Sequence, residues 1–196
     1  LSLTGVNFAL AMLTEQSPAE GETAREWTAL QANATGASFG GIDGLTIEAS
    51  SISVAINRAA EDTSLVDFNA QNLEVQTGTS ANPSSITLNL AASLGEVTRA
   101  SGNLTLDAFG FFRVSGNLNL DKSTRSIKLG DVAGTDVDES ENAVAVDALL
   151  LGGSDLTAFA GINGGQAGAT GLSLTGVNFA LAMLTEQSPA EGETAR

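Results

Sequence analysis

The sequence predicts an all-β, elongated tandem-repeat unit, either β-solenoid-like or a coiled stack of β-sheets, with at most one short helix. Three observations predict this class. Apolar and polar residues alternate with a period of two, and one end of the chain repeats the other. Hydrophobic residues make up 42% of the chain but aromatic residues only 5%, so the core must be thin. A thin core suits stacked sheets or a solenoid better than a bulky globule.

The repeat is the strongest of these signals. Residues 172–196 copy residues 1–25 without a difference, both reading LSLTGVNFALAMLTEQSPAEGETAR. Chance does not produce twenty-five consecutive identities, and a shared fold alone does not fix surface residues such as Glu15 and Gln16. Residues 1–171 are therefore interpreted as one full repeat period and residues 172–196 as the start of the next.

The period-two segments predict strands with one apolar and one polar face. Several of them open in the same way, with Gly or Asn followed by Leu, any residue and an aliphatic residue. Because Gly and Asn tolerate positive φ, each is predicted to be a turn residue that starts a strand. The segments are 45–49, 52–56, 86–90, 104–106, 118–120 and 144–148, and the predicted turn residues are Gly44, Asn72, Asn103, Asn117 and Gly171.

The alternation slips by one residue inside two of the predicted strands. One slip falls at Ser50 and Ser51, and the other at Thr175 and Gly176. A slip would turn the apolar side chains to the wrong face unless a bulge or corner intervenes. Small residues at both places predict such a bend.

The best helix candidate is residues 10–15 continuing to residues 18–25, where Ser17 and Pro18 resemble an N-cap and a residue of the first helical turn. Gly21 weakens this helix, and a surface loop is the alternative.

Aromatic side chains are few. Outside the copied segment they are Trp27, a cluster of Phe109, Phe111 and Phe112, and three other phenylalanines. These four are interpreted as packing residues, in the core or at the junction between units, in preference to carbohydrate-stacking residues.

Composition excludes several kinds of function. The net charge is −15, and removing the second copy, whose net charge is −2, leaves −13 per period. This charge would repel nucleic acid and anionic lipid, so neither is an expected partner. The chain has no Cys, His or Tyr, so it lacks thiolate ligands and the commonest general base. No nucleophile elbow or distinctive carboxylate pair occurs, so an enzyme is not expected, and no apolar run reaches the length of a membrane span.

Two kinds of binding or modification site remain candidates. Carboxylates at Asp136, Asp138, Glu139 and Glu141 are ligands of the type that Ca²⁺ prefers, although their spacing fits no established calcium loop; a solvated acidic loop is the alternative. Otherwise no cofactor is expected. Asn33 and Asn103 stand in N-glycosylation sequons.

The copied segment is predicted to form the seam of the array, an edge that pairs with the neighbouring unit. Its partners are then other copies of the same repeat. The predicted seam residues are Leu172, Leu174, Val177, Phe179, Leu181 and Trp27.

Three phrases, GLSLTGVNFALAML, FGGIDGLTIEASSISVAINRA and ASGNLTLDAFGFFRVSGNLNLDKST, resemble repeats of very large, adhesin-like surface proteins of aquatic bacteria. The resemblance covers most of the period and implies an extracellular or cell-surface location. It suggests a structural repeat of a filament or giant surface protein that propagates end to end through strand pairing. The alternative is an adhesin module that recognises glycans or surfaces through its loops.

Overall fold

The computed structural model describes residues 1–129 and 143–187, and confirms that the chain is all-β. Its helical content in those residues is one 3₁₀ turn. The elements are β1 (Ser2–Thr4), β2 (Asn7–Thr14), β3 (Glu26–Phe39), β4 (Leu45–Arg58), β5 (Leu73–Gln76), β6 (Ser85–Leu88), η1 (Ala92–Leu94), β7 (Val97–Ala108), β8 (Phe112–Lys128), β9 (Ala143–Ile162) and β10 (Thr170–Glu186).

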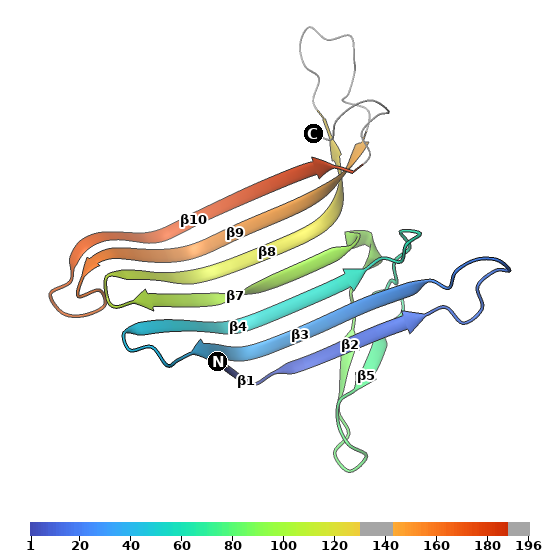
Figure 1. The fold of residues 1–196 in the computed structure, drawn as a ribbon, viewed down its shortest axis with the longest axis horizontal. Coiled ribbons are helices and arrows are strands. Elements are labelled where there is room, and N and C mark those ends of the chain that lie inside the picture. The colour runs from blue at the N-terminus through green and yellow to red at the C-terminus, as the bar shows by residue number, and fades with distance from the viewer. Residues whose placement is uncertain (130–142, 188–196) are drawn as a thin grey trace, which may run out of the picture.

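The long strands form one antiparallel sheet in the order β1-β3-β4-β7-β8-β9-β10 (Figure 1). β1 and β2 both pair with β3, one after the other, so together they form one edge, and β10 forms the opposite edge. Hairpins join most neighbouring strands, whereas the rungs of a solenoid stack in parallel. The described residues accordingly make an open sheet and no closed solenoid.

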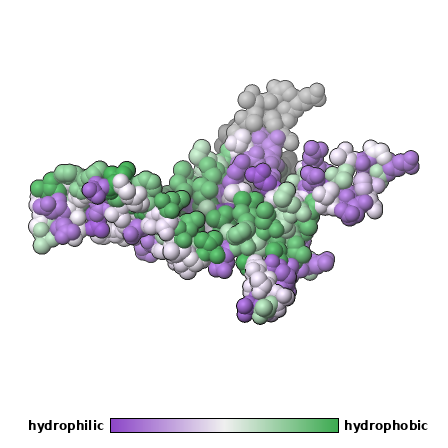
Figure 2. All heavy atoms as spheres, turned by 60° about the horizontal axis from the view of Figure 1, so that its bottom comes forward, coloured by the Kyte–Doolittle hydropathy of each residue, from purple (hydrophilic) through white to green (hydrophobic). Residues whose placement is uncertain are grey.

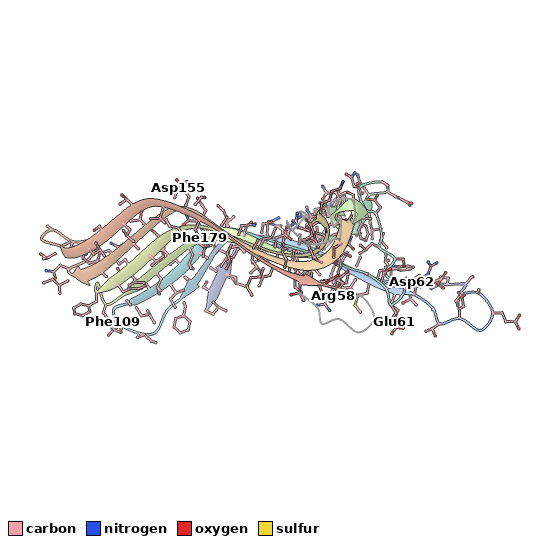
Figure 3. The ribbon with its side chains drawn as sticks, turned by 90° about the horizontal axis from the view of Figure 1, so that it is seen from above. Arg58, Glu61, Asp62, Phe109, Asp155 and Phe179 are labelled. Atoms are coloured by element: carbon pink, nitrogen blue, oxygen red, sulfur yellow. The ribbon has the colours of Figure 1, made fainter. Side chains whose placement is uncertain are left out.

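Both predicted phase slips are confirmed as irregularities in strand pairing. The register shifts between Ser50 and Ser53, where Ser51 has a φ of 52°, and between Leu174 and Val177, where Gly176 has a φ of 65°. Bulges of this kind bend a strand and increase its twist. Figure 3 shows the result as an arch in the sheet near Asp155.

The predicted turn residues divide into two groups. Gly44, with a φ of 80°, and Asn72 directly precede β4 and β5, as expected. The prediction is wrong for Asn103 and Asn117, which lie inside β7 and β8, and for Gly171, which is the second residue of β10. The Asn103 side-chain amide donates to the Asn117 side-chain carbonyl oxygen across the strands at 3.3 Å, so the two asparagines form a polar contact between strands and not a turn.

A small second layer covers one end of the sheet near the β2 edge. The β5–β6 hairpin and its flanking segments pack over Ala9 and Ala11 of β2 and Ala29 of β3. Phe68 and Leu88, both at most 2% exposed, are the largest apolar side chains in this core. The rest of the described sheet is largely a single layer, and the chain exposes 12877 Å², against roughly 8,600 Å² for a compact monomer of its mass.

The helix predicted over residues 10–15 and 18–25 is wrong, because residues 10–14 lie in β2 and residues 15–25 form the alternative, a loop. Gly21 adopts a φ of 86°, and the Arg25 guanidinium closes the loop through an ion pair of 2.8 Å with Glu15. The β2–β3 connection is thus the loop of an antiparallel hairpin. In the described part of the chain, no helix has the length and apolar character required to cross a membrane.

A place in the core is wrong for the phenylalanine cluster, whereas packing at a junction between units stays a prediction. Phe109, Phe111 and Phe112 lie at the β7–β8 hairpin and are 59%, 60% and 45% exposed, and Figure 3 places Phe109 at the far end of the sheet. Phe109 and Gly110 both have positive φ, as the central residues of a tight hairpin turn require. The aromatic side chains therefore project from a hairpin tip with no second layer to cover them.

Candidate functional site

The two copies of the repeated segment occupy the two edges of the sheet (Figure 1). The first copy forms β1 and β2 and pairs with β3, from Ser2 opposite Ser38 to Thr14 opposite Glu26. The second copy forms most of β10 and pairs with β9, from Leu172 opposite Ala160 to Glu186 opposite Val146. One sequence thus pairs with two different neighbours, and these two edges are the candidate functional site.

The copies share a local conformation at their common break. Gly5 and Gly176 have φ values of 58° and 65°. In each copy the following asparagine folds back on that glycine: the Asn7 amide donates to the Gly5 carbonyl oxygen at 3.3 Å, and the Asn178 amide donates to the Gly176 carbonyl oxygen at 3.2 Å. The break is therefore built by the sequence itself and does not depend on which strand lies alongside.

Backbone hydrogen bonds indicate that the copies use opposite edges of the strand. In the first copy, Glu15 donates its N–H to the Arg25 carbonyl oxygen at 2.9 Å, on the β3 side. In the second copy, Gln187, the equivalent of Gln16, donates its N–H to the Ala145 carbonyl oxygen at 3.0 Å, on the β9 side. Because successive residues of a strand direct their N–H groups to opposite sides, a single copy has the groups needed to pair with both neighbours.

Five of the six predicted seam residues lie in the edge strand β10, and the sixth, Trp27, lies in the strand next to the other edge. Trp27 lies in β3 opposite Leu13 of the first copy, and its indole N–H donates to the Ser64 carbonyl oxygen at 3.1 Å. The other five lie in β10 with large exposed fractions, from 37% for Val177 to 67% for Leu172: Leu172, Leu174, Val177, Phe179 and Leu181.

One prediction compares the two glycines of the break. Replacing either with alanine places a Cβ in left-handed backbone, which should destabilise the fold by roughly 1–2 kcal/mol. At Gly5 the new Cβ would also overlap the Thr35 side chain, whereas at Gly176 nothing lies within 4 Å. Urea unfolding should therefore show Gly5→Ala to be the more destabilising of the pair. Equal losses would contradict the distinct environments of the two edges.

A buried ionic cluster lies further along the sheet. Asp121 is 6% exposed and accepts hydrogen bonds from the guanidinium groups of Arg99, at 2.7 Å, and Arg125, at 3.2 Å. Desolvation favours the protonated acid, but a hydrogen bond with Ser123 and the two arginines outweigh it and lower the pKa of Asp121 below its ordinary value. The carboxylate is thus held charged as a structural partner of the arginines.

This cluster predicts a pH-dependent stability. Because the pKa of Asp121 is lower in the folded state, its contribution is complete above about pH 4 and disappears as the pH falls through the folded-state pKa. Asp121→Asn should reduce the free energy of unfolding by about 1–2 kcal/mol at pH 7, and the difference from the parent should shrink in acid. Urea unfolding at pH 7 and in acid measures the free energy of unfolding of the variant and the parent, and the exposed Glu48→Gln is the control. A difference that persists unchanged at low pH would contradict the ionic role.

The remaining candidate residues divide by location. Asp136, Asp138, Glu139 and Glu141 lie outside the described residues. Within residues 1–129 and 143–187, no group of three or more metal-ligating side chains comes together. Asn33 lies mid-strand in β3 and accepts a hydrogen bond from the Asn7 amide at 3.3 Å, and Asn103 lies mid-strand in β7.

Sequence reasoning missed the segment that covers the first copy. Residues 59–96 supply the second layer, yet the sequence pattern predicts only two further strands there, one after Asn72 and one over residues 86–90. A usable signal was present in the copied segment, where Ala9, Ala11 and Leu13 form an apolar stripe of mostly small residues opposite the larger stripe of Phe8, Leu10 and Met12. An apolar stripe on each side of one strand indicates that either face could be covered, and in this structure residues 59–96 cover the alanine face.

Comparison with known proteins adds no further assignment. No protein-family model, curated protein or solved structure matches this chain.

Proposed function

We propose that this chain is a structural repeat of an extracellular bacterial filament or giant surface protein, and that the repeat propagates through strand pairing. One observation carries the proposal: the same repeated sequence forms opposite edges of one sheet, through residues 2–14 in the first copy and 172–186 in the second. In an array, a single copy takes both positions, as the last strand beside β9 of one unit and the first strand beside β3 of the next. Each unit then extends its neighbour's sheet.

The strand order supports this continuity. β2 and β10 stand six strand steps apart in an antiparallel sheet, and an even number of steps makes them run in the same direction. A second unit can therefore join the first without reversing the chain. At about 4.8 Å per strand step, one unit should lengthen the array by roughly 29 Å.

Charge and composition fit such an assembly. A charge of −13 per unit accumulates along an array, which keeps it soluble and opposes lateral clumping at low ionic strength. The absence of cysteine removes unpaired thiols from a protein that would face an oxidising exterior. The partner is another copy of the repeat, and the extracellular location also rests on the resemblance to bacterial surface repeats.

Electron microscopy of a chain with several consecutive periods tests the proposal. The expected result is an axial advance of roughly 29 Å for every 171 residues. Independent compact domains of that length would instead advance by about 40 Å or more per unit. A bead-like array with the longer spacing would overturn continuous strand pairing.

A further inference from the structure

The copied segment is buried differently in its two positions, although its sequence is the same. One face carries Phe8, Leu10 and Met12 in the first copy and Phe179, Leu181 and Met183 in the second, and all six are exposed. The opposite face differs. Ala9 and Ala11 are 1% and 6% exposed, whereas their equivalents Ala180 and Ala182 are exposed.

The difference has one source, the second layer formed by residues 59–96. This segment follows β4 in the chain and returns over β2, where Phe68 and Leu88 contact the small residues of the first copy. Ala9 and Ala11 leave room for these larger side chains. Among the described residues no second layer covers this face of β10, and Leu184, the equivalent of the half-buried Leu13, is 43% exposed.

The geometry points to a docking surface on β10, formed by Ala180, Ala182 and Leu184, whose occupant is residues 59–96 of a second copy of this repeat. The inference rests on the proposed function and adds a second contact to the paired strands. The occupant follows from sequence identity, because the same three side chains already bind that segment in the first copy.

The hairpin would also reach the preceding unit. In Figure 1, β5 runs across the direction of β2, and the turn that follows it projects past the edge of the sheet. Figure 2, seen with that edge brought forward, shows the hairpin standing out beside an apolar area of the surface. In an array β9 of the preceding unit lies beyond that edge, so the hairpin would span the boundary between two units and hold them together.

Thiol labelling tests this cover directly, since the chain has no native cysteine. Ala182→Cys in the 196-residue chain should react rapidly with a maleimide. The same substitution in the middle copy of a two-unit chain, residues 1–171 joined to residues 1–196, should react at least about 100-fold more slowly, because reaction then requires local opening. Ala11→Cys is the protected reference and Ser173→Cys the exposed one in both chains.

Amide hydrogen exchange at the residues of that copy whose N–H groups face β9, such as Gln187, separates this inference from the proposed function, because the second unit alone would protect only the amides that face its β3. Slow exchange together with a slow thiol supports both. If exchange is slow but the thiol reacts as fast as in the single unit, strand pairing between units is supported and docking of residues 59–96 on the copied segment is overturned. Fast exchange of the middle copy overturns the proposed function itself. Val75→Glu in the second unit should restore thiol reactivity and leave the amides protected; protection of both would contradict the assignment of the occupant.

Discussion

Replacing Ala11 with glutamate is expected to destabilise the chain by about 3–5 kcal/mol, because the carboxylate would be buried without a partner beneath the β5–β6 hairpin. The same replacement at Ala182 should change the free energy of unfolding by no more than about 0.5 kcal/mol, since that face of β10 is open. Urea unfolding of the two variants measures the contrast between identical sequence positions.

The pair is its own control, because the substituted residue and its sequence neighbours match in both copies. In the two-unit chain, Ala182→Glu falls in the middle copy. There it should reduce the free energy of unfolding as much as Ala11→Glu does. If Ala11→Glu were as mild as Ala182→Glu in the single unit, residues 59–96 would not form a stable cover over β2.

Truncating Phe68 to alanine is expected to destabilise the fold by about 3–5 kcal/mol. Phe68 is 2% exposed and central to the core between the hairpin and β2, and loss of its ring would leave a cavity in addition to the lost burial. The measurement is again the free energy of unfolding in urea. The midpoint temperature of thermal unfolding should fall in parallel.

Phe111→Ala is the matched control for Phe68→Ala, since the same ring is removed from a site that is 60% exposed. Its effect should stay within about 0.5 kcal/mol. A larger loss at Phe111 than at Phe68 would mean that the hairpin tips, and not the covered edge, carry the stability of the unit.

Much of the sheet could be predicted from local sequence. Alternation located β4, and the slip at Ser50 and Ser51 located its bulge, because both depend on residues close together in the chain. Asn103 and Asn117 were assigned to turns because asparagine tolerates turn conformations. Their actual role, a hydrogen bond between neighbouring strands, depends on the register of β7 against β8, which no local pattern encodes.

The position of the candidate site at a sheet edge could be predicted from the sequence, but its burial could not. An exact repeat identifies the copied segment, and pairing rules predict an edge for it. Its burial depends on residues 59–96, whose placement over Ala9 and Ala11 requires the chain to return across the sheet after β4. Periodicity cannot distinguish such a covering hairpin from another strand of the sheet, because both show the same alternation.

The direction of the strands has a mechanical consequence for the proposed array. Since units would join side by side across the sheet, tension along the array would act along the hydrogen bonds between strands and open them one at a time. Such peeling needs little force. Each unit that gave way would release 171 residues, with a contour length of roughly 560–620 Å in place of its folded advance. The array would then yield by lengthening at constant low load, and a tether of this kind absorbs sudden pulls without breaking its backbone.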